Sequence, residues 1–273
     1  MKLSKGIKNF WTQISYIFLI SALFISIALK LFGWEAASLI TVIGAFWLLG
    51  FLHLTKSMLL QGLPDKWKAR PPSLEDFPVS DLDWLQQQSA VLESLGFVRL
   101  RDYKLPEPFQ SFGRSFAHPQ QYCFAEVGLL PATSNKPAVA HHLTIFTLLD
   151  KSWRLSVVNR ELKIEDSYLL PYRNQRNITV FDPNLSLEQV FQAHLMTRQQ
   201  VITDLEITVL ADVSWDAYAK FNQNLITQMK QARRRKSLLI GMIEATLYEL
   251  NPKPDWFYGD YPALAAKRRM RNR

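Results

Sequence analysis

The sequence predicts an α+β fold in which an N-terminal transmembrane helical hairpin precedes a soluble domain. Two apolar blocks, at residues 14–31 and 36–54, indicate the hairpin. Strand-like alternation between residues 97 and 181 predicts an antiparallel sheet of about four to six strands. Helix-like periodicity on either side of that region predicts three helices, which gives the soluble domain its α+β class.

Each apolar block is long enough to cross a bilayer. About 18 residues at about 1.5 Å per residue reach roughly 27 Å, close to the roughly 30 Å hydrocarbon core. Neither block contains Asp, Glu or Arg, and Lys30 lies at an end where its stem reaches the interface. A secretory signal has a shorter apolar region, about 7–15 residues, and a cleavage site. We therefore predict two uncleaved spans joined by the turn Phe32–Glu35.

Small residues spaced four apart are expected to let the two helices approach closely. They are Ala22, Ser26, Ala37, Thr41 and Ala45. Lysines precede the hairpin and further Lys and Arg residues follow it, whereas the turn offers only one lysine beside a glutamate. The positive-inside rule then places both termini in the cytoplasm. We expect an integral protein of the plasma membrane or of an internal bacterial membrane.

The net charge of +8 is unevenly distributed along the chain. Residues 1–60 carry +4, residues 61–229 carry −3 and residues 230–273 carry +7. The excess therefore lies beside the spans and near the C-terminus, which favours an anionic membrane over nucleic acid as its partner. The single cysteine, Cys123, excludes an intrachain disulfide and is expected to be a buried, inert thiol.

Composition divides the chain into four regions. Residues 1–60 are the hairpin, and the proline-rich residues 61–78 read as a linker. Residues 79–250 are long enough for one cytoplasmic domain with its own core. Residues 251–273 are rich in aromatic and basic side chains and form a tail.

The first elements of the predicted domain follow from local signals. A helix is predicted from Asp81 or Asp83 to Ser94, with Gly96 at the position of a C′ glycine. Residues 97–103 alternate apolar and charged side chains and predict a half-buried strand. Prolines and a glycine predict a loop over 105–120.

The remaining strands and helices are predicted in the same way. Strands are expected at 121–130, 139–149, 153–158 and 178–181, with a loop at 131–137 and a hairpin turn at 150–152. Ser186 and Gln189 form a capping box for the next helix. Residues 202–209 favour a last strand over a continuation of that helix. Ser214 is expected to cap a long helix from Trp215 to about Leu250.

No catalytic motif stands out. The sequence lacks a glycine-rich phosphate loop, a nucleophile elbow and an H-E-x-x-H pair, so no cofactor or metal is expected. His141 and His142 are adjacent on a predicted strand and therefore point to opposite faces. A site joining one of them with His118, His194 and Glu126 is conceivable, but no spacing requires it.

Basic residues near the C-terminus form the candidate surface. They suit contact with anionic lipid headgroups, and the alternatives are a solvated helix face and a disordered tail. RNA binding is not expected, because no ribonucleoprotein signature accompanies these residues. The candidate lipid-facing residues are Lys230, Arg233, Arg234, Arg235, Lys236, Lys267, Arg268 and Arg269.

Several segments together resemble a group of bacterial membrane proteins, cyanobacterial in type, that have a two-helix anchor and a cytoplasmic α+β domain. The resembling pieces are the anchor, the helix ending at Leu95–Phe97, the hairpin Thr147–Asn159 and a helix containing His194. The hairpin turn has Asp150-Lys151 where Asp-Gly would be expected. The resemblance implies no activity.

Three functions remain open from the sequence. The first is a membrane-anchored, non-enzymatic protein whose cytoplasmic domain binds a protein partner or assists a membrane complex. The second is a peripheral module that binds anionic lipid. The third is an enzyme acting on a membrane-bound substrate. The first is preferred, because the chain has a complete anchor and a core-sized domain without a catalytic signature.

Overall fold

The computed structural model describes residues 3–61, 63–64, 66–72, 79–105, 112–130, 140–162, 167 and 170–271. The expected loop at 131–137 and parts of the expected linker and of the loop at 105–120 lie outside these residues. Within them the chain forms seven α-helices and one six-stranded mixed sheet, which is an α+β architecture.

The chain divides into two compact units that are interleaved in sequence. The first comprises Met1–Leu63, Lys163–Tyr172 and Lys230–Pro252, and the second comprises Pro64–Leu162, Arg173–Met229 and Lys253–Arg273.

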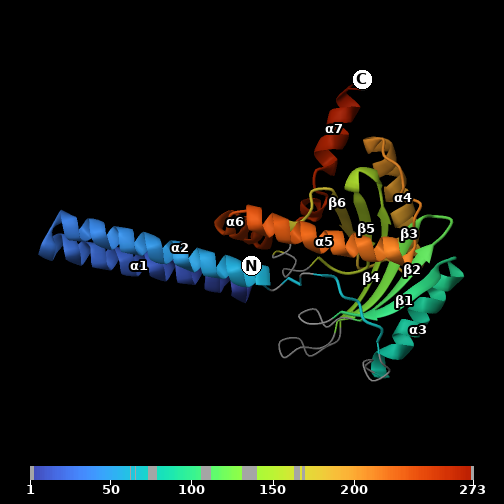
Figure 1. The fold of residues 1–273 in the computed structure, drawn as a ribbon. Helices are drawn as coiled ribbons and strands as arrows, with labels where there is room; N and C mark the ends of the chain where they lie inside the picture. Colours follow the sequence, from blue (N-terminus) through green and yellow to red (C-terminus); the bar gives the residue numbers. More distant parts are fainter. Residues whose placement is uncertain are drawn as a thin grey trace. The chain divides into compact units, whose positions relative to one another are not determined.

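The first unit contains the two long N-terminal helices (Figure 1). α1 (Lys5–Phe32) and α2 (Trp34–Gln61) are joined at Gly33 and run antiparallel. Both are long and apolar enough to cross a membrane by length and composition. The two apolar blocks lie inside these helices, which continue beyond the blocks at their free ends.

The contact between α1 and α2 uses other small residues than the sequence suggested. Ala28 and Ala37 are buried, and a Cβ added to Gly44 would lie 2.7 Å from the Ser21 hydroxyl. Of the expected set only Ala37 is buried, and the other four, Ala22, Ser26, Thr41 and Ala45, are exposed. On α1 the buried Ile7, Phe10 and Ile14 are three and four residues apart, and Ala28 follows fourteen residues later. This is the heptad spacing of paired helices, and residues spaced strictly four apart drift away from the contact.

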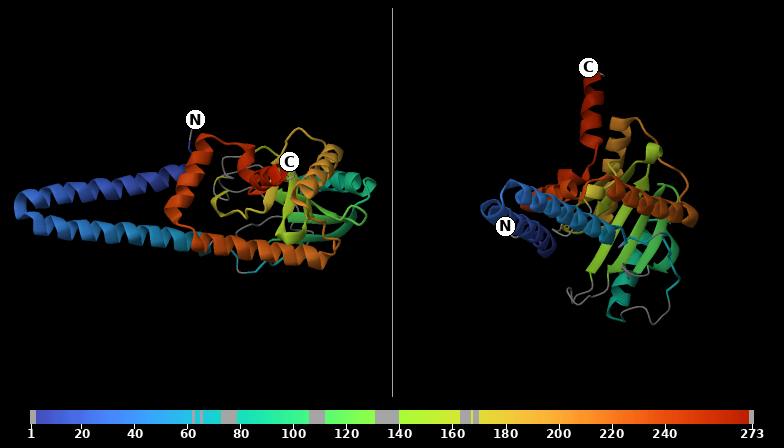
Figure 2. Two further views of the ribbon diagram at one scale, coloured as in Figure 1. Left: turned by 90° about the horizontal axis from the view of Figure 1, so that it is seen from above. Right: turned by 60° about the vertical axis from the view of Figure 1, so that its left-hand side comes forward.

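α6 (Leu238–Leu250) lies across the free ends of α1 and α2 (Figure 2). Its buried side chains Leu238, Met242 and Ala245 form one apolar cluster with residues of both long helices. The α1 members are Ile7, Phe10 and Ile14, and the partly buried α2 members include Leu48, Phe51 and Leu52. This cluster is the core of the first unit.

Two cations cap helix ends at the corner before α6. Lys56 Nζ donates to the main-chain carbonyls of Arg234 (2.7 Å) and Lys236 (3.1 Å), at the end of α5 (Trp215–Arg235). Arg233 Nη1 donates to the Leu59 carbonyl (2.6 Å), at the end of α2. Each cation satisfies carbonyls that have no partner within their own helix. The single helix expected from Trp215 to about Leu250 is therefore wrong, since the chain breaks between α5 and α6.

The second unit is built on the sheet, whose order is β1-β2-β3-β4-β5-β6. The strands are β1 (Val98–Lys104), β2 (Phe112–His118), β3 (Cys123–Leu130), β4 (Ala140–Leu148), β5 (Arg154–Val158) and β6 (Asn177–Phe181). β1 to β5 form an antiparallel meander, and the expected turn at 150–152 joins β4 to β5. β6 pairs with β5 in parallel, which corrects the expectation of a wholly antiparallel sheet.

Helices cover both faces of the sheet (Figure 1). α3 (Val79–Ser94) and α4 (Leu187–Leu205) pack on one face around Phe116, Ala125 and Ile145. α5 packs on the other face, where Tyr218 contacts Phe124 and Phe146. The predicted caps are confirmed: the capping box precedes α4, and Gly96 at φ +90° follows α3.

Three further expectations were wrong. β2 occupies part of the expected loop at 105–120, because it is buried on both faces and shows no alternation of apolar and polar residues. Residues 202–205 continue α4 instead of forming a strand, and Val209 makes only an isolated bridge to Leu149. The expected tail contains α7 (Tyr261–Arg271), so the soluble part has more than three helices.

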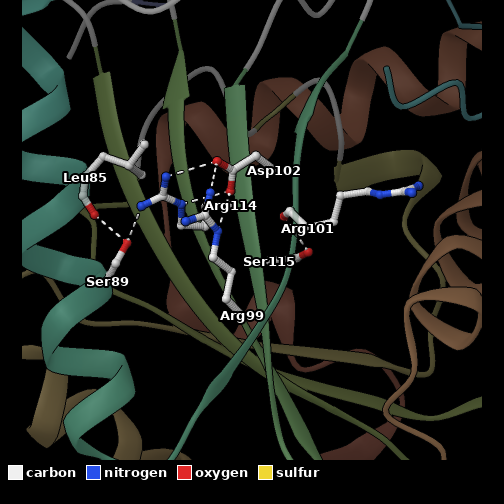
Figure 3. Close-up of polar contacts among 7 residues, drawn as sticks. All are labelled: Leu85, Ser89, Arg99, Arg101, Asp102, Arg114 and Ser115. Carbon is white, nitrogen blue, oxygen red and sulfur yellow. Dashed lines mark hydrogen bonds and ion pairs between the residues drawn. The ribbon is translucent and has the colours of Figure 1, made fainter. Parts of the chain in front are cut away.

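A buried ion pair links β1, β2 and α3 (Figure 3). Arg114 donates Nε to Asp102 Oδ1 (2.8 Å) and Nη2 to Oδ2 (2.9 Å), and its Nη1 to the Ser89 hydroxyl (2.8 Å). Arg99 reaches the same carboxylate from the exposed side. All three nitrogens of the buried Arg114 thus have partners, as a buried charge requires.

We predict that Arg114→Leu destabilises the protein far more than Arg99→Leu. Removal of the buried partner leaves Asp102 and Ser89 poorly paired, which costs about 3 kcal/mol. The half-exposed Arg99 contributes at most about 1 kcal/mol through the same carboxylate. Urea unfolding of the full chain in mild detergent measures both free energies. Equal losses in the two variants would contradict the assignment of Arg114 as the structural partner.

Candidate functional site

The structure separates the residues considered for an acid/base or metal centre. Glu126 and His142 lie on the sheet face that α5 covers, with Oε1 and Nε2 3.3 Å apart. His141 stacks on Trp84 of α3 at 4.1 Å between ring centres, so the adjacent histidines point to opposite faces as predicted. Only His142 approaches Glu126.

The other two histidines lie on the opposite face, in structural positions. His118 packs against Phe97 and Phe191, with ring centres 5.1 and 5.4 Å apart. His194 is fully buried, and its Nε2 lies 2.7 Å from the Thr147 hydroxyl. The four-residue site that the sequence left conceivable is therefore not formed. Among the residues that the structure describes, no group of three or more His, Cys, Asp or Glu side chains is arranged to hold a metal.

Cys123 is a buried thiol, as predicted. Burial raises its pKa to about 12, and the nearby positive charge of Arg198 only partly opposes this effect. The thiol therefore stays protonated at neutral pH and is not a thiolate nucleophile.

A polar network not anticipated from the sequence holds α5 to the sheet. The Tyr218 hydroxyl donates to Glu126 Oε2 (2.7 Å) and lies 2.8 Å from the Tyr103 hydroxyl. His142 contacts the other carboxylate oxygen. The network joins α5, β1, β3 and β4, which are far apart in the sequence. No local motif signals it.

The charge of Glu126 is stabilised by these partners. Burial alone would raise its pKa, but the hydrogen bond and charge of His142 and the hydroxyls of Tyr218 and Tyr103 lower it to about 2. Burial and the neighbouring carboxylate raise the pKa values of both tyrosines well above 10. At neutral pH this carboxylate is ionised and the phenols are protonated. A group with so low a pKa is poorly matched to proton transfer near pH 7.

The structure divides the predicted basic surface between the two units. Lys230 to Lys236 belong to the first unit and Lys267 to Arg269 to the second. In the first unit Arg233 caps α2 and lies 5.3 Å over the Tyr172 ring. Lys236 donates to the Pro171 carbonyl and pairs with Glu244. Arg234 and Arg235 are the residues of this run that the structure leaves exposed.

In the second unit two of the basic residues hold α7 to the end of α4. Arg269 pairs with Asp204 (2.7 Å), which also accepts a hydrogen bond from Tyr261 (2.7 Å). Arg268 pairs with Glu206 (3.1 Å). Lys267 is exposed. These ion pairs show that the C-terminal basic residues contribute to a helix contact and are not simply a solvated tail.

Two of the hollows in the described part of the chain bear on the search for a site. One, about 290 Å³, lies beside α5 in the second unit and has amide side chains on its wall, among them Asn174 and Gln228, which hydrogen-bond to each other (2.6 Å). The other, about 380 Å³, is an apolar groove between α1 and α2 beside Ser21 and Gly44. The first also has the charged side chains Asp212 and Lys220 on its wall.

The fold and these sites define an α+β protein with two long, exposed apolar helices and a helix-covered sheet. No protein-family model matches the chain, and no match is found among curated proteins or among solved structures. Its function is therefore argued from its own residues.

We predict that His194 makes the protein less stable in acid. Burial, helped by the charge of Arg198, lowers its folded-state pKa to about 3, whereas the unfolded histidine titrates near 6.5. Between pH 6.5 and 3 the unfolded state binds the extra proton. The free energy of unfolding then falls by about 1.4 kcal/mol for each pH unit below 6.5.

His194→Gln should therefore flatten the fall in stability between pH 6.5 and 5, although it lowers stability at pH 7. Urea unfolding of the full chain in mild detergent at several pH values measures the slope. Thr147→Val is the matched control, because it removes the hydrogen-bond partner but keeps the buried imidazole and thus the steep slope. An unchanged slope in His194→Gln would refute the assignment.

Proposed function

We propose that this chain is an integral membrane protein whose second unit is a cytoplasmic, non-enzymatic module that binds a protein partner or assists a membrane complex. The observation that carries the proposal is the exposed apolar surface of α1 and α2. In the most apolar 18-residue stretch of each helix, only 11% is buried in α1 and only 6% in α2. A core helix of a soluble protein buries most of such a surface, whereas a bilayer accommodates it at no cost.

The distribution of charge supports a direction for the insertion. Lys5 and Lys8 are exposed at the free end of α1, and Lys56 lies near the free end of α2. The turn between the helices has Lys30 and Glu35, whose charges offset each other. By the positive-inside rule the free ends, and with them the second unit, lie on the cytoplasmic side.

The support for a binding module over an enzyme comes from the roles of the polar groups. Glu126 is ionised and surrounded by donors, His194 is a buried neutral base, and Asp102 is paired with arginine. Each of these groups stabilises a contact between elements. A lipid-binding role is the second candidate, and the exposed Arg234 and Arg235 favour it.

Cysteine labelling on intact cells tests the topology. Trp34→Cys, at the start of α2 beside the connection between the helices, should react with a membrane-impermeant maleimide added outside. Gln231→Cys, exposed on α5, should react only after permeabilisation. The parent chain is the control, because its only cysteine is buried. Labelling of Gln231→Cys in intact cells would contradict the orientation, and labelling of both positions in intact cells would contradict a membrane hairpin.

Purification in mild detergent tests the partner. The tagged full chain should recover the same protein partner in independent preparations, since the cytoplasmic module is proposed to work by binding. A parallel purification from cells without the tagged chain supplies the background. Mass spectrometry identifies the recovered proteins. Repeated recovery of the chain alone would count against the proposal.

A further inference from the structure

α6 has an outward face made only of aliphatic side chains. Its four exposed residues are Ile240 (53%), Ile243 (47%), Leu247 (50%) and Leu250 (46%). They follow spacings of three, four and three residues, so they form one stripe along the helix. A helix on the surface of a soluble protein normally turns polar side chains to water. This stripe therefore needs an apolar environment.

The opposite face of α6 fixes its position on the hairpin. Leu238, Met242 and Ala245 pack on α1 and α2, and Trp11 Nε1 donates to the Thr246 hydroxyl (2.9 Å). The contacts on the long helices lie within residues 7–14 and 48–59, where the two apolar blocks end. If the hairpin spans a bilayer, α6 lies at the level of the cytoplasmic headgroups.

The acidic groups of α6 have partners within the first unit. Glu249 is 3% exposed and accepts hydrogen bonds from the Ser4 main-chain nitrogen (2.6 Å) and the Ser167 hydroxyl (2.8 Å). Glu244 pairs with Lys236. The aliphatic stripe is thus free of unpaired acidic side chains from its own helix.

Among the residues that the structure describes, exposed positive charges lie near the stripe. Arg234 and Arg235 immediately precede α6, and Lys5 and Lys8 are exposed on the first turns of α1, the helix that α6 contacts. An aliphatic face beside basic residues matches an anionic leaflet, where acyl chains receive the stripe and headgroups receive the cations. A protein partner that covered the stripe would need an apolar face of its own, and that face would have to continue the lipid surface around the hairpin. The lipid itself already meets this requirement.

We propose that α6 is an interfacial helix that inserts Ile240, Ile243, Leu247 and Leu250 into the headgroup–acyl boundary of the anionic cytoplasmic leaflet. The proposal rests on the membrane anchor proposed above and adds a third membrane-contacting element to it. Because α6 follows α5 directly, the contact fixes the end of α5 at the lipid surface.

Spin labels on the full chain test the inference. Ile243→Cys and Leu247→Cys are labelled separately with a nitroxide and reconstituted in bilayers of phosphatidylcholine and phosphatidylglycerol. The measured quantities are the collision rates of the label with oxygen, which partitions into lipid, and with a water-soluble nickel chelate. Phe24→Cys in the hairpin and Met196→Cys on α4, a residue that is 72% exposed, are the lipid and water references. The buried Cys123 of the parent chain provides the unlabelled background.

Oxygen collisions should exceed nickel collisions at positions 243 and 247, with values between those of the two references. Labels at 243 and 247 that behave like the label at 196, while the label at 24 stays in lipid, would overturn the α6 proposal and leave the anchor intact. A water-accessible label at 24 would overturn both. Shielding from both reagents, or dipolar broadening between copies, would show that protein covers the stripe and would also overturn the proposal.

The anionic preference has its own readout. The label at Leu247 should move toward water when phosphatidylglycerol is omitted, and Arg234→Gln with Arg235→Gln should produce the same shift in the anionic bilayer. A depth that is independent of both changes would overturn the role of the basic residues.

Discussion

The packing of α6 against the free ends of α1 and α2 is the constraint on which the first unit depends. It brings residues 230–252 onto helices more than 170 residues earlier in the chain. Lys56 of α2 caps the end of α5, and Arg233 of α5 caps the end of α2. These two contacts hold the corner that makes the packing of α6 possible. The hairpin is therefore not a detachable anchor, since its removal would leave the apolar residues Leu238 and Met242 without a partner.

The second unit meets a different requirement, because its central strands are buried on both faces. Charged and hydroxyl groups on those strands can be kept only if each finds a partner. On one face Arg114 is saturated by Asp102 and Ser89, and on the other Glu126 is held by Tyr218 and His142. These polar groups tie the helices to the sheet.

These two requirements bear on function together. Exposed apolar helices favour a bilayer as the surroundings of the first unit. The hydrogen-bonded Arg114 and Glu126 support the binding role that we propose for the second. The basic residues, expected to form one lipid-facing surface, have separate tasks: Arg233 caps α2, Arg269 holds α7 on α4, and Arg234 and Arg235 remain exposed beside the aliphatic face of α6.

The sequence by itself determined the features that depend on neighbouring residues. Continuous apolar blocks define α1 and α2, Ser186 and Gln189 define the start of α4, and Gly96 defines the end of α3. Only the tertiary structure decided the features that depend on distant partners. β2 is a strand because neighbours on both faces bury it, β6 is parallel because a crossover returns it beside β5, and the chain breaks after α5 because α6 packs on the hairpin. Glu126 and Tyr218 meet for the same reason: their contact is created by folding, and no local pattern encodes it.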